Sequence, residues 1–305
     1  MKNRLTLMAR SPMLLLVGSS FVFATKIMVA KAALSAGALP FQLAFVGNLG
    51  AGLLVFGLIL RSGERIPTSR AHILLYLGLG IISFAAPTVL SYAVVDRVGP
   101  AYTSTVYALS PILTMSFAAG LGIERMYLRR FLGILIGLTG MLILVQQQFT
   151  QIDTDATLWV ALGLLIPAFA AIGNVIRSKF WPAGTSALAF AGATLLTSSV
   201  LVLCMAPLFE DPRTWEFSLP VLWGWIALMI AVSAISYVLN FQLQKVAGPV
   251  VFSQIGYWGT GFGVVLAALL FGDVLTALSL IGLAAIICGG VIARRAAGKG
   301  HTAPT

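Results

Sequence analysis

Ten long apolar segments separated by short gaps constrain the fold of this chain more than any other feature of its sequence. The segments cover residues 13–34, 39–60, 73–95, 101–123, 128–146, 158–176, 188–208, 219–243, 250–271 and 275–293. A helix needs ~20 residues to cross the ~30 Å hydrocarbon core of a bilayer, and each segment is close to that length. None of them alternates polarity at every second residue, as the strands of a membrane barrel do. The sequence therefore predicts an all-α membrane protein with ten transmembrane helices.

The composition agrees with this fold class. Hydrophobic residues make up 59% of the chain, charged residues only 9%, and the mean hydropathy is +0.99. So few charges could not cover the surface of a soluble domain of this length. The formal net charge of +10 does not indicate nucleic-acid binding, because no basic face is interleaved with exposed aromatic residues. The expected partner of these charges is the lipid bilayer with its anionic headgroups. Nothing in the sequence supports a homodimer, which stays open.

The basic residues indicate how the helices are oriented. Fifteen of the 19 Lys and Arg residues lie in alternate gaps: Lys2, Arg4, Arg10, Arg61, Arg65, Arg70, Arg125, Arg129, Arg130, Arg177, Lys179, Lys245, Arg294, Arg295 and Lys299. The intervening gaps hold only Arg97 and Arg213, together with most of the acids. Short basic loops remain in the cytoplasm during membrane insertion. We therefore expect a multi-pass protein of the bacterial inner membrane with both ends inside.

An internal repeat divides the chain into two halves. At an offset of 149 residues, Gly99-Pro100 aligns with Gly248-Pro249 without gaps, and further identities follow at Ser104, Ala118, Ala119, Leu121, Gly133 and Gly140. Five helices per half is an odd number, so the second half must be inverted relative to the first, as in many secondary transporters. The predicted organisation is a cytoplasmic N-terminus (1–12), a first repeat (13–146), a periplasmic connection (147–157), a second repeat (158–293) and a cytoplasmic tail (294–305).

Three motifs carry a resemblance to a known family. They are Gly18-Ser19 followed by Lys26, Gly122-Ile123-Glu124-Arg125 followed by Gly133 and Gly140, and Phe271-Gly272-Asp273 followed by Gly282 and Gly289-Gly290. The chain resembles the EamA-like branch of the drug/metabolite transporter superfamily, whose members are ten-helix inverted-repeat exporters. The resemblance implies export of small metabolites, with amino acids, aromatic ones included, as the leading substrates. The second helix of that family often carries an Arg where this chain has Gly47-Asn48, so an anion-binding role for that Arg does not carry over.

Several function classes are excluded by what the spans lack. No acid lies deep in a span, which argues against a buried carboxylate as proton carrier. The chain has no Walker phosphate loop, so no ATP-driven transport is expected. Both histidines, His72 and His301, lie at a membrane boundary or in the tail. We therefore expect no enzyme activity, no catalytic residues, no metal site and no cofactor.

Lys26 is the one cation far inside a predicted span. It lies ~12 Å from the outer end of its helix, and burying it in lipid would cost ~2.5–3.5 kcal/mol. Ser19, Phe23 and Lys26 share one helix face, which we predict to line a cavity between the repeats. There the ammonium would face a substrate carboxylate. The alternative is a structural Lys that binds helix-end carbonyls or tilts into the outer interface.

Other polar residues follow helical spacing on the fourth, eighth and ninth spans. The full set of predicted substrate-binding residues is Lys26, Ser19, Phe23, Asn48, Tyr107, Ser110, Tyr237, Asn240, Gln254, Tyr257 and Trp258. The aromatic members would contact an apolar or aromatic substrate group, and the amides its polar remainder. The alternative for each is packing between helices, because polar side chains also hold helices together in lipid.

These features predict a secondary transporter that exports small organic metabolites, foremost amino acids, by alternating access. Two alternatives remain open from the sequence. One is efflux of cationic aromatic drugs. The other is a lipid flippase or scramblase, which would open a lateral groove to the bilayer.

Overall fold

The regular elements of the described residues are all helices, as the apolar segments predict. The computed structural model describes residues 11–123, 127–149, 157–215, 217, 220–271 and 276–295. The first half contains α2 (Pro12–Ser35), α3 (Pro40–Ser62), α4 (Arg70–Leu79), η1 (Gly80–Ala85), α5 (Ala86–Arg97), α6 (Pro100–Val106), η2 (Tyr107–Leu109), α7 (Ser110–Gly120) and α8 (Leu128–Phe149). The second half contains α9 (Thr157–Gly163), α10 (Leu165–Lys179), α11 (Ala187–Met205), η4 (Ala206–Leu208), η5 (Pro212–Thr214), α12 (Pro220–Ser253), α13 (Ile255–Phe271) and α14 (Ala277–Arg295).

Six helical stretches are long and apolar enough to cross a membrane: Pro12–Ser35, Pro40–Ser62, Arg70–Arg97, Thr157–Lys179, Ala187–Leu208 and Pro220–Ser253. Three shorter apolar helices are Phe131–Gly140, Ile255–Leu270 and Ala277–Ile292. The predicted span 101–123 is divided into α6, η2 and α7. The protein is therefore an all-helical, multi-pass membrane protein, while the count of ten crossings stays a prediction.

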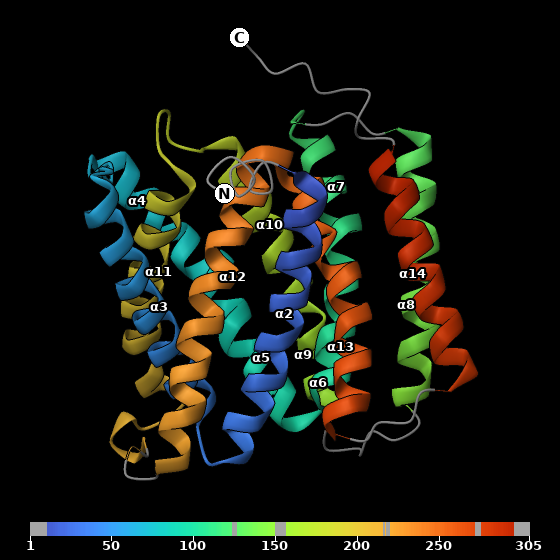
Figure 1. The fold of residues 1–305 in the computed structure, drawn as a ribbon, viewed down its shortest axis with the longest axis horizontal. Coiled ribbons are helices and arrows are strands. Elements are labelled where there is room, and N and C mark those ends of the chain that lie inside the picture. Colours follow the sequence, from blue (N-terminus) through green and yellow to red (C-terminus); the bar gives the residue numbers. More distant parts are fainter. Residues whose placement is uncertain are drawn as a thin grey trace, which may run out of the picture.

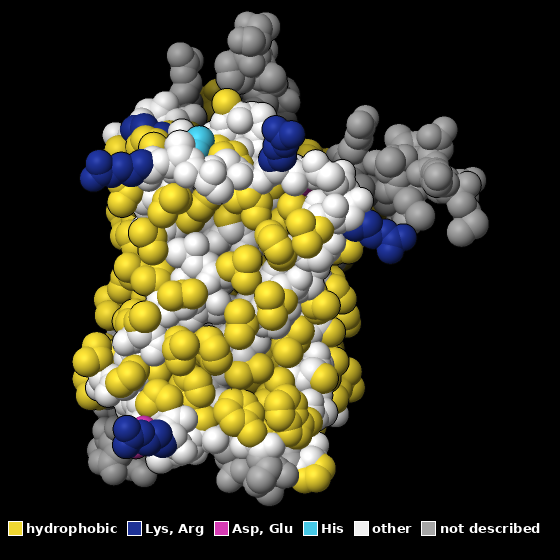
Figure 2. Space-filling model, turned by 90° about the vertical axis from the view of Figure 1, so that its left-hand side faces the viewer, with side chains coloured by type: hydrophobic (Ala, Val, Ile, Leu, Met, Phe, Trp, Pro, Cys, Tyr) yellow, Lys and Arg dark blue, Asp and Glu magenta, His cyan; other side chains and the backbone are white. Residues whose placement is uncertain are grey.

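The outer surface is that of a protein embedded in lipid. Figure 2 shows hydrophobic side chains over the middle of the molecule and most of the visible Lys and Arg side chains at one end. Among the exposed residues of α3 are Leu53, Leu54 and Leu58, each about half exposed. An apolar surface of this extent needs a cover, which a bilayer supplies. The helix α2 begins and α14 ends at the basic end of the bundle (Figures 1 and 2).

Several cations that the sequence assigned to cytoplasmic gaps lie on helices, and two of them, Arg177 and Lys245, contact other helices or loops of the bundle. Arg177 lies in the last turn of α10 and is only 3% exposed. Lys245 lies within α12, and its Nζ donates a hydrogen bond to the Thr185 carbonyl at 2.9 Å. Both residues lie in helical rather than irregular backbone, because α10 and α12 continue beyond the ends of their apolar segments.

Three helices that face the centre of the bundle are interrupted. Between α4 and α5, the turn Gly80–Ala85 is a π-helix. Pro87 has no backbone N–H to donate to the carbonyl four residues earlier, so the turn before it widens. The second interruption is the 3₁₀ turn η2, and the third separates α12 from α13 at Gln254. Interruptions of this kind often mark functional positions.

The helix α2 runs through the middle of the bundle, packed against α12 and α13 (Figure 1). On one side of it α3 packs on α11, and on the other α8 packs on α14. These two outer pairs flank the central helices, so the residues that could enclose a cavity belong to the central group.

Residues that align in the predicted repeat occupy similar environments. Gly99 and Gly248 have φ angles of 114° and 78°, which favour glycine, and each is followed by a proline in helical conformation. In the α8–α14 contact, a Cβ on Gly140 would lie 2.5 Å from the Gly282 carbonyl oxygen, and one on Gly289 would meet the Gly133 carbonyl. Because Gly133 aligns with Gly282 and Gly140 with Gly289, a two-fold relation between the halves requires this pair of contacts.

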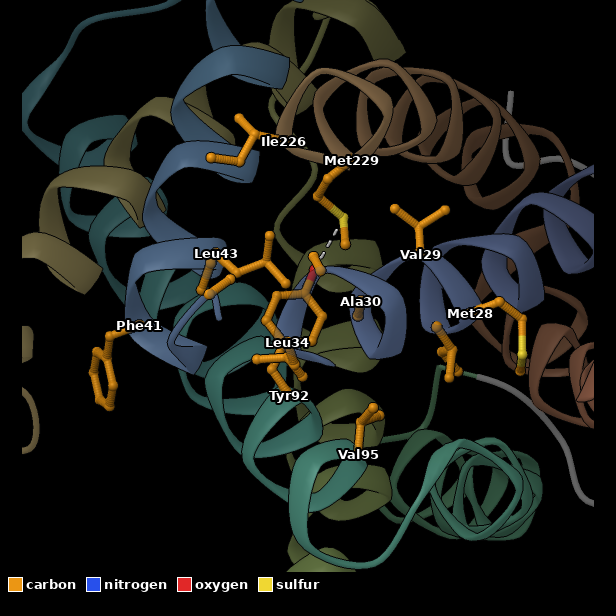
Figure 3. Packing of buried hydrophobic residues seen from close by; sticks show 14 of the residues in the cluster. Met28, Val29, Ala30, Leu34, Phe41, Leu43, Tyr92, Val95, Ile226 and Met229 are labelled. Carbon is orange, nitrogen blue, oxygen red and sulfur yellow. Dashed lines mark hydrogen bonds between the residues drawn. The ribbon is translucent and has the colours of Figure 1, made fainter. Parts of the chain in front are cut away.

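A hydrophobic cluster fills the bundle beyond Lys26 along α2. Figure 3 shows part of it, with Met28 and Leu34 from α2, Tyr92 from α5 and Met229 from α12. The Tyr92 hydroxyl lies 3.5 Å from the Met229 sulfur, a weak hydrogen bond. Tyr92 thus connects the cluster to the region around Lys26.

Candidate functional site

A cavity of about 130 Å³ lies among the central helices. Its wall includes all three interrupted regions, because η1, η2 and the end of α12 each contribute residues. The lining residues include Phe23, Lys26, Ser83, Phe84, Ser91, Tyr92, Tyr107, Ser110, Asn174, Arg177, Tyr237, Asn240, Phe241 and Phe252. They come from both halves of the chain.

Lys26 enters this cavity from α2. Its Nζ donates a hydrogen bond to the Tyr237 hydroxyl at 3.2 Å and lies 4.6 Å from the centre of that ring. The Tyr92 ring lies 6.0 Å away from the same nitrogen. A ring face attracts a cation, and the attraction strengthens when water is excluded. In the structure Lys26 therefore contacts aromatic side chains rather than helix-end carbonyls.

Phe23 and Tyr107 form the neighbouring part of the wall. Their rings meet edge to face with centroids 4.7 Å apart. The Tyr107 hydroxyl is 2.8 Å from Ser91 Oγ. On the far side of Tyr107, its backbone carbonyl contacts Gly256 so closely that no Cβ would fit there. Tyr107 is thus held at the crossing of two helices while its ring faces the cavity.

Arg177 also lines the cavity, from α10. Its Nε donates to Gln244 Oε1, and Nη2 donates to Asn174 Oδ1 at 2.9 Å. The guanidinium carbon lies 4.7 Å from the Phe241 ring centre and 4.9 Å from that of Phe252. All of these partners are uncharged. The cavity therefore holds two cations, and no Asp or Glu is among its described lining residues.

Six of the eleven predicted binding residues line the cavity: Phe23, Lys26, Tyr107, Ser110, Tyr237 and Asn240. The other five lie elsewhere. Ser19 is fully buried, and Asn48 donates to Ser198 Oγ at 3.1 Å across the α3–α11 contact. Tyr257 donates to the Ile134 carbonyl at 3.1 Å and packs on α8, and Trp258 lies beside Gly290 of α14.

Gln254 is the least expected of the five. It lies in the break between α12 and α13, is 1% exposed, and neither of its side-chain amide atoms has a hydrogen-bond partner in the described part of the chain. It is adjacent in sequence to two cavity-lining residues but does not itself line the cavity.

Sequence reasoning missed Arg177, Asn174 and the serine and aromatic residues of η1 and α5. A signal for the first two was present, since Asn174 and Arg177 are three residues apart and share one helix face. It was hidden because Arg177 follows directly on an apolar segment, where a basic residue is typical of a cytoplasmic boundary. The residues of η1 carry no periodic polar pattern, because the π-turn shifts the helix face.

Comparison with known proteins identifies the fold. Residues 10–146 match the model of the EamA-like transporter family. The match covers most of the first half of the chain and confirms the resemblance that the sequence motifs carry. The matched family is one of membrane transporters. A protein of known crystal structure matches with a TM-score of 0.69 and 17% identity, over 90% of this chain and 98% of its own. At that identity the likeness shows a shared fold alone. No curated protein matches.

Proposed function

We propose that this EamA-like protein is a secondary transporter that exports small carboxylate-bearing metabolites across the bacterial inner membrane. Amino acids, aromatic ones included, are the leading class of substrate. The observation that carries this proposal is Lys26, whose ammonium projects into a cavity among aromatic rings with no acid among the described lining residues. An ammonium in such a place attracts an anion, and the rings of Phe23 and Tyr107 supply an apolar surface for the rest of the molecule.

Of the two alternatives, efflux of cationic aromatic drugs fits this cavity poorly. The described wall holds Lys26 and Arg177 without a carboxylate, so a cationic substrate would be repelled by both side chains. A flippase or scramblase needs a groove open to the bilayer, and no described contact favours that arrangement over a cavity enclosed by helices from both halves. We therefore retain a carboxylate transporter.

We further propose alternating access by rocking of two inverted repeats, 13–146 and 158–293. Support comes from the aligned glycines of the α8–α14 contact and from Tyr107, which aligns with Gly256 and also contacts it. A residue that touches its own repeat partner lies on the two-fold axis. Discontinuous helices at such an axis are typical of transporter binding sites. In this mechanism, the hydrophobic cluster around Met28 and Tyr92 would act as a gate between the cavity and one side of the membrane, and its side chains are packed together in the present conformation.

The orientation, with ten crossings and both ends in the cytoplasm, can be tested with single cysteines. In a background lacking Cys204 and Cys288, a cysteine at exposed Asp211 should react with an impermeant reagent added outside the cell. A cysteine at exposed Ser69 should react only after permeabilisation. Reaction of the Ser69 variant in intact cells would reverse the orientation.

The function is tested by Lys26→Ala in proteoliposomes loaded with labelled amino acids. If the ammonium pairs with a carboxylate, this change should abolish transport while the melting temperature stays close to that of the wild type. Lys26→Arg should keep part of the activity, because the charge survives on a broader, planar group.

The control is a substrate and its amide. The wild type should prefer the acid, and Lys26→Ala should discriminate little between the two. A lowered melting temperature with an unchanged preference for the acid would instead assign Lys26 to holding α2 against α12.

A further inference from the structure

Arg177 is a second cation of the cavity that neither the family match nor the sequence pattern assigns to a function. It is 3% exposed, although it lies only two residues from the exposed Lys179 at the end of α10. Three phenyl rings, of Phe84, Phe241 and Phe252, surround its guanidinium. Its charge is thus turned inward, toward the cavity, rather than to the solvent beyond the helix end.

The charge of Arg177 is not balanced within the described part of the chain. The one ion pair found there joins Arg97 to Asp96, both well exposed. Arg177 donates to two amide oxygens, of Asn174 and Gln244, which satisfy only part of its five N–H donors and none of its charge. Lys26 is in the same position, since its described partners are a hydroxyl and two rings. Because neither cation has an acidic partner in the described part of the chain, the cavity favours the binding of anionic groups.

Lys26 of α2 and Arg177 of α10 contact different residues along one face of α12. Lys26 contacts Tyr237, whereas Arg177 contacts Phe241 and Gln244, four and seven residues further on. At 1.5 Å per residue, the two contact points are ~6–10 Å apart along the helix axis. A short organic molecule with an anionic group at each end spans such a distance.

The wall between the two cations offers neutral polar atoms. Asn240 and Ser83 are both cavity-lining residues, and Asn240 Oδ1 and Ser83 Oγ are buried atoms with no hydrogen-bond partner among the described residues. Such groups are costly to leave unpaired in a low-dielectric interior, so a ligand that bonds to them is favoured. They suit the polar backbone of a substrate such as an acidic amino acid.

We propose that the cavity binds substrates carrying two anionic groups, one at Lys26 and one at Arg177. The preferred class is short dicarboxylates, including amino acids with an acidic side chain. The planar guanidinium presents paired N–H donors, which match a carboxylate in bidentate geometry, whereas the ammonium of Lys26 acts as a point charge. This inference rests on the proposed carboxylate transport and narrows its substrate.

The test is transport by the full-length protein in proteoliposomes, with aspartate, glutamate, succinate, glutarate and adipate compared with monocarboxylates of the same chain length. The wild type should prefer the dicarboxylate of each pair by about tenfold or more, as expected for a charge-assisted bidentate pair. The series should show an optimum chain length. Equal rates for both members of every pair would overturn the proposal, while continued transport of monocarboxylates would leave the proposed function intact. Transport of neither class would overturn both.

Variants at two neighbouring cations assign the effect to Arg177. Arg177→Gln should lower dicarboxylate transport much more than monocarboxylate transport and so lose most of the dicarboxylate preference, and Arg177→Lys should keep part of the preference. Lys179→Gln removes an exposed cation from the same helix and should behave as the wild type. If Arg177→Gln lowered the transport of both classes equally while remaining folded, Arg177 would be structural and the proposal would fail.

Two further measurements keep the result decisive. If Arg177→Gln fails to fold, the proposal can still be tested with the wild type. A dicarboxylate should raise the melting temperature of the wild type more than the matched monocarboxylate does at equal concentration. Added inorganic phosphate distinguishes a free anion from a second substrate group. If phosphate stimulated monocarboxylate transport, Arg177 would bind a separate anion, and the two-ended substrate would be ruled out.

Discussion

The α8–α14 contact and the central cavity are both made by helices from the two halves, yet their surfaces are opposite in character. In the contact, glycines let the two backbones meet, with Gly140 against Gly282 and Gly289 against Gly133. In the cavity, residues with cationic, hydroxyl and amide side chains surround a space that the described side chains leave open. The α8–α14 contact is the arrangement that close helix packing in lipid favours, because small residues let the two helices make more dispersion contacts. The polar groups around the cavity instead have hydrogen-bonding capacity that a bound ligand can satisfy.

We therefore expect substitutions in the α8–α14 contact to change mainly stability, and substitutions in the cavity to change mainly transport. The contact should be intolerant of added atoms and indifferent to the substrate. The cavity should tolerate loss of atoms in the folded state and respond through transport.

The largest expected effect is on stability, from Gly289→Ala. The added methyl group would meet the backbone of Gly133 and Gly137, which cannot move without separating the helices. Overpacking of this kind costs ~1–3 kcal/mol or more, so the melting temperature in detergent should fall strongly. Gly57→Ala is the matched control, since among the described residues no other helix approaches within 4 Å of its added Cβ. Equal melting temperatures for the two variants would show that the α8–α14 contact tolerates an added methyl group, contrary to the prediction.

A smaller and opposite pair of effects is expected for two asparagines. Asn240→Ala should lower transport severalfold with little change in melting temperature, because Asn240 Oδ1 is unpartnered at the cavity wall. Asn48→Ala removes the hydrogen bond to Ser198 and should cost about 0.6 kcal/mol of stability, with transport per folded molecule unchanged. Both variants are measured for transport and thermal unfolding. If Asn48→Ala lowered transport and Asn240→Ala lowered only stability, Asn48 would belong to the binding site and Asn240 would not.

The smallest expected effect is that of a proton gradient. No Asp or Glu is among the described residues that line the cavity, so no carboxylate there can carry a proton between the two faces. Imposing a pH gradient of either sign should therefore change substrate exchange less than ~twofold, unlike transporters with acidic proton relays. Flux is compared in proteoliposomes with matched and stepped pH. Steep acceleration would point to Lys26 or a tyrosine as the titrating group.

The candidate site was predictable where a residue is unusual in its own helix. Lys26 stands out because a cation far inside a span is costly, and the stripe Tyr237–Asn240 keeps helical spacing on α12. Tyr257 and Trp258 were predicted on equal grounds but pack against α8 and α14. A polar or aromatic side chain facing a neighbouring helix and one facing a cavity look alike along the sequence, because both lie on a buried face.

The sequence by itself determined the all-helical membrane class, the positions of the apolar segments and the aligned glycines of the two halves. These features depend on hydrophobic length and backbone conformation, which are set locally, residue by residue. Only the tertiary structure decided which faces enclose the cavity, that Arg177 turns inward among three phenyl rings, and that Asn48 pairs across α3 and α11. Those outcomes depend on the rotation of each helix about its axis and on the interruptions at η1, η2 and Gln254. Rotation is set by the simultaneous packing of partners that lie far apart in the chain, so no single segment contains the information.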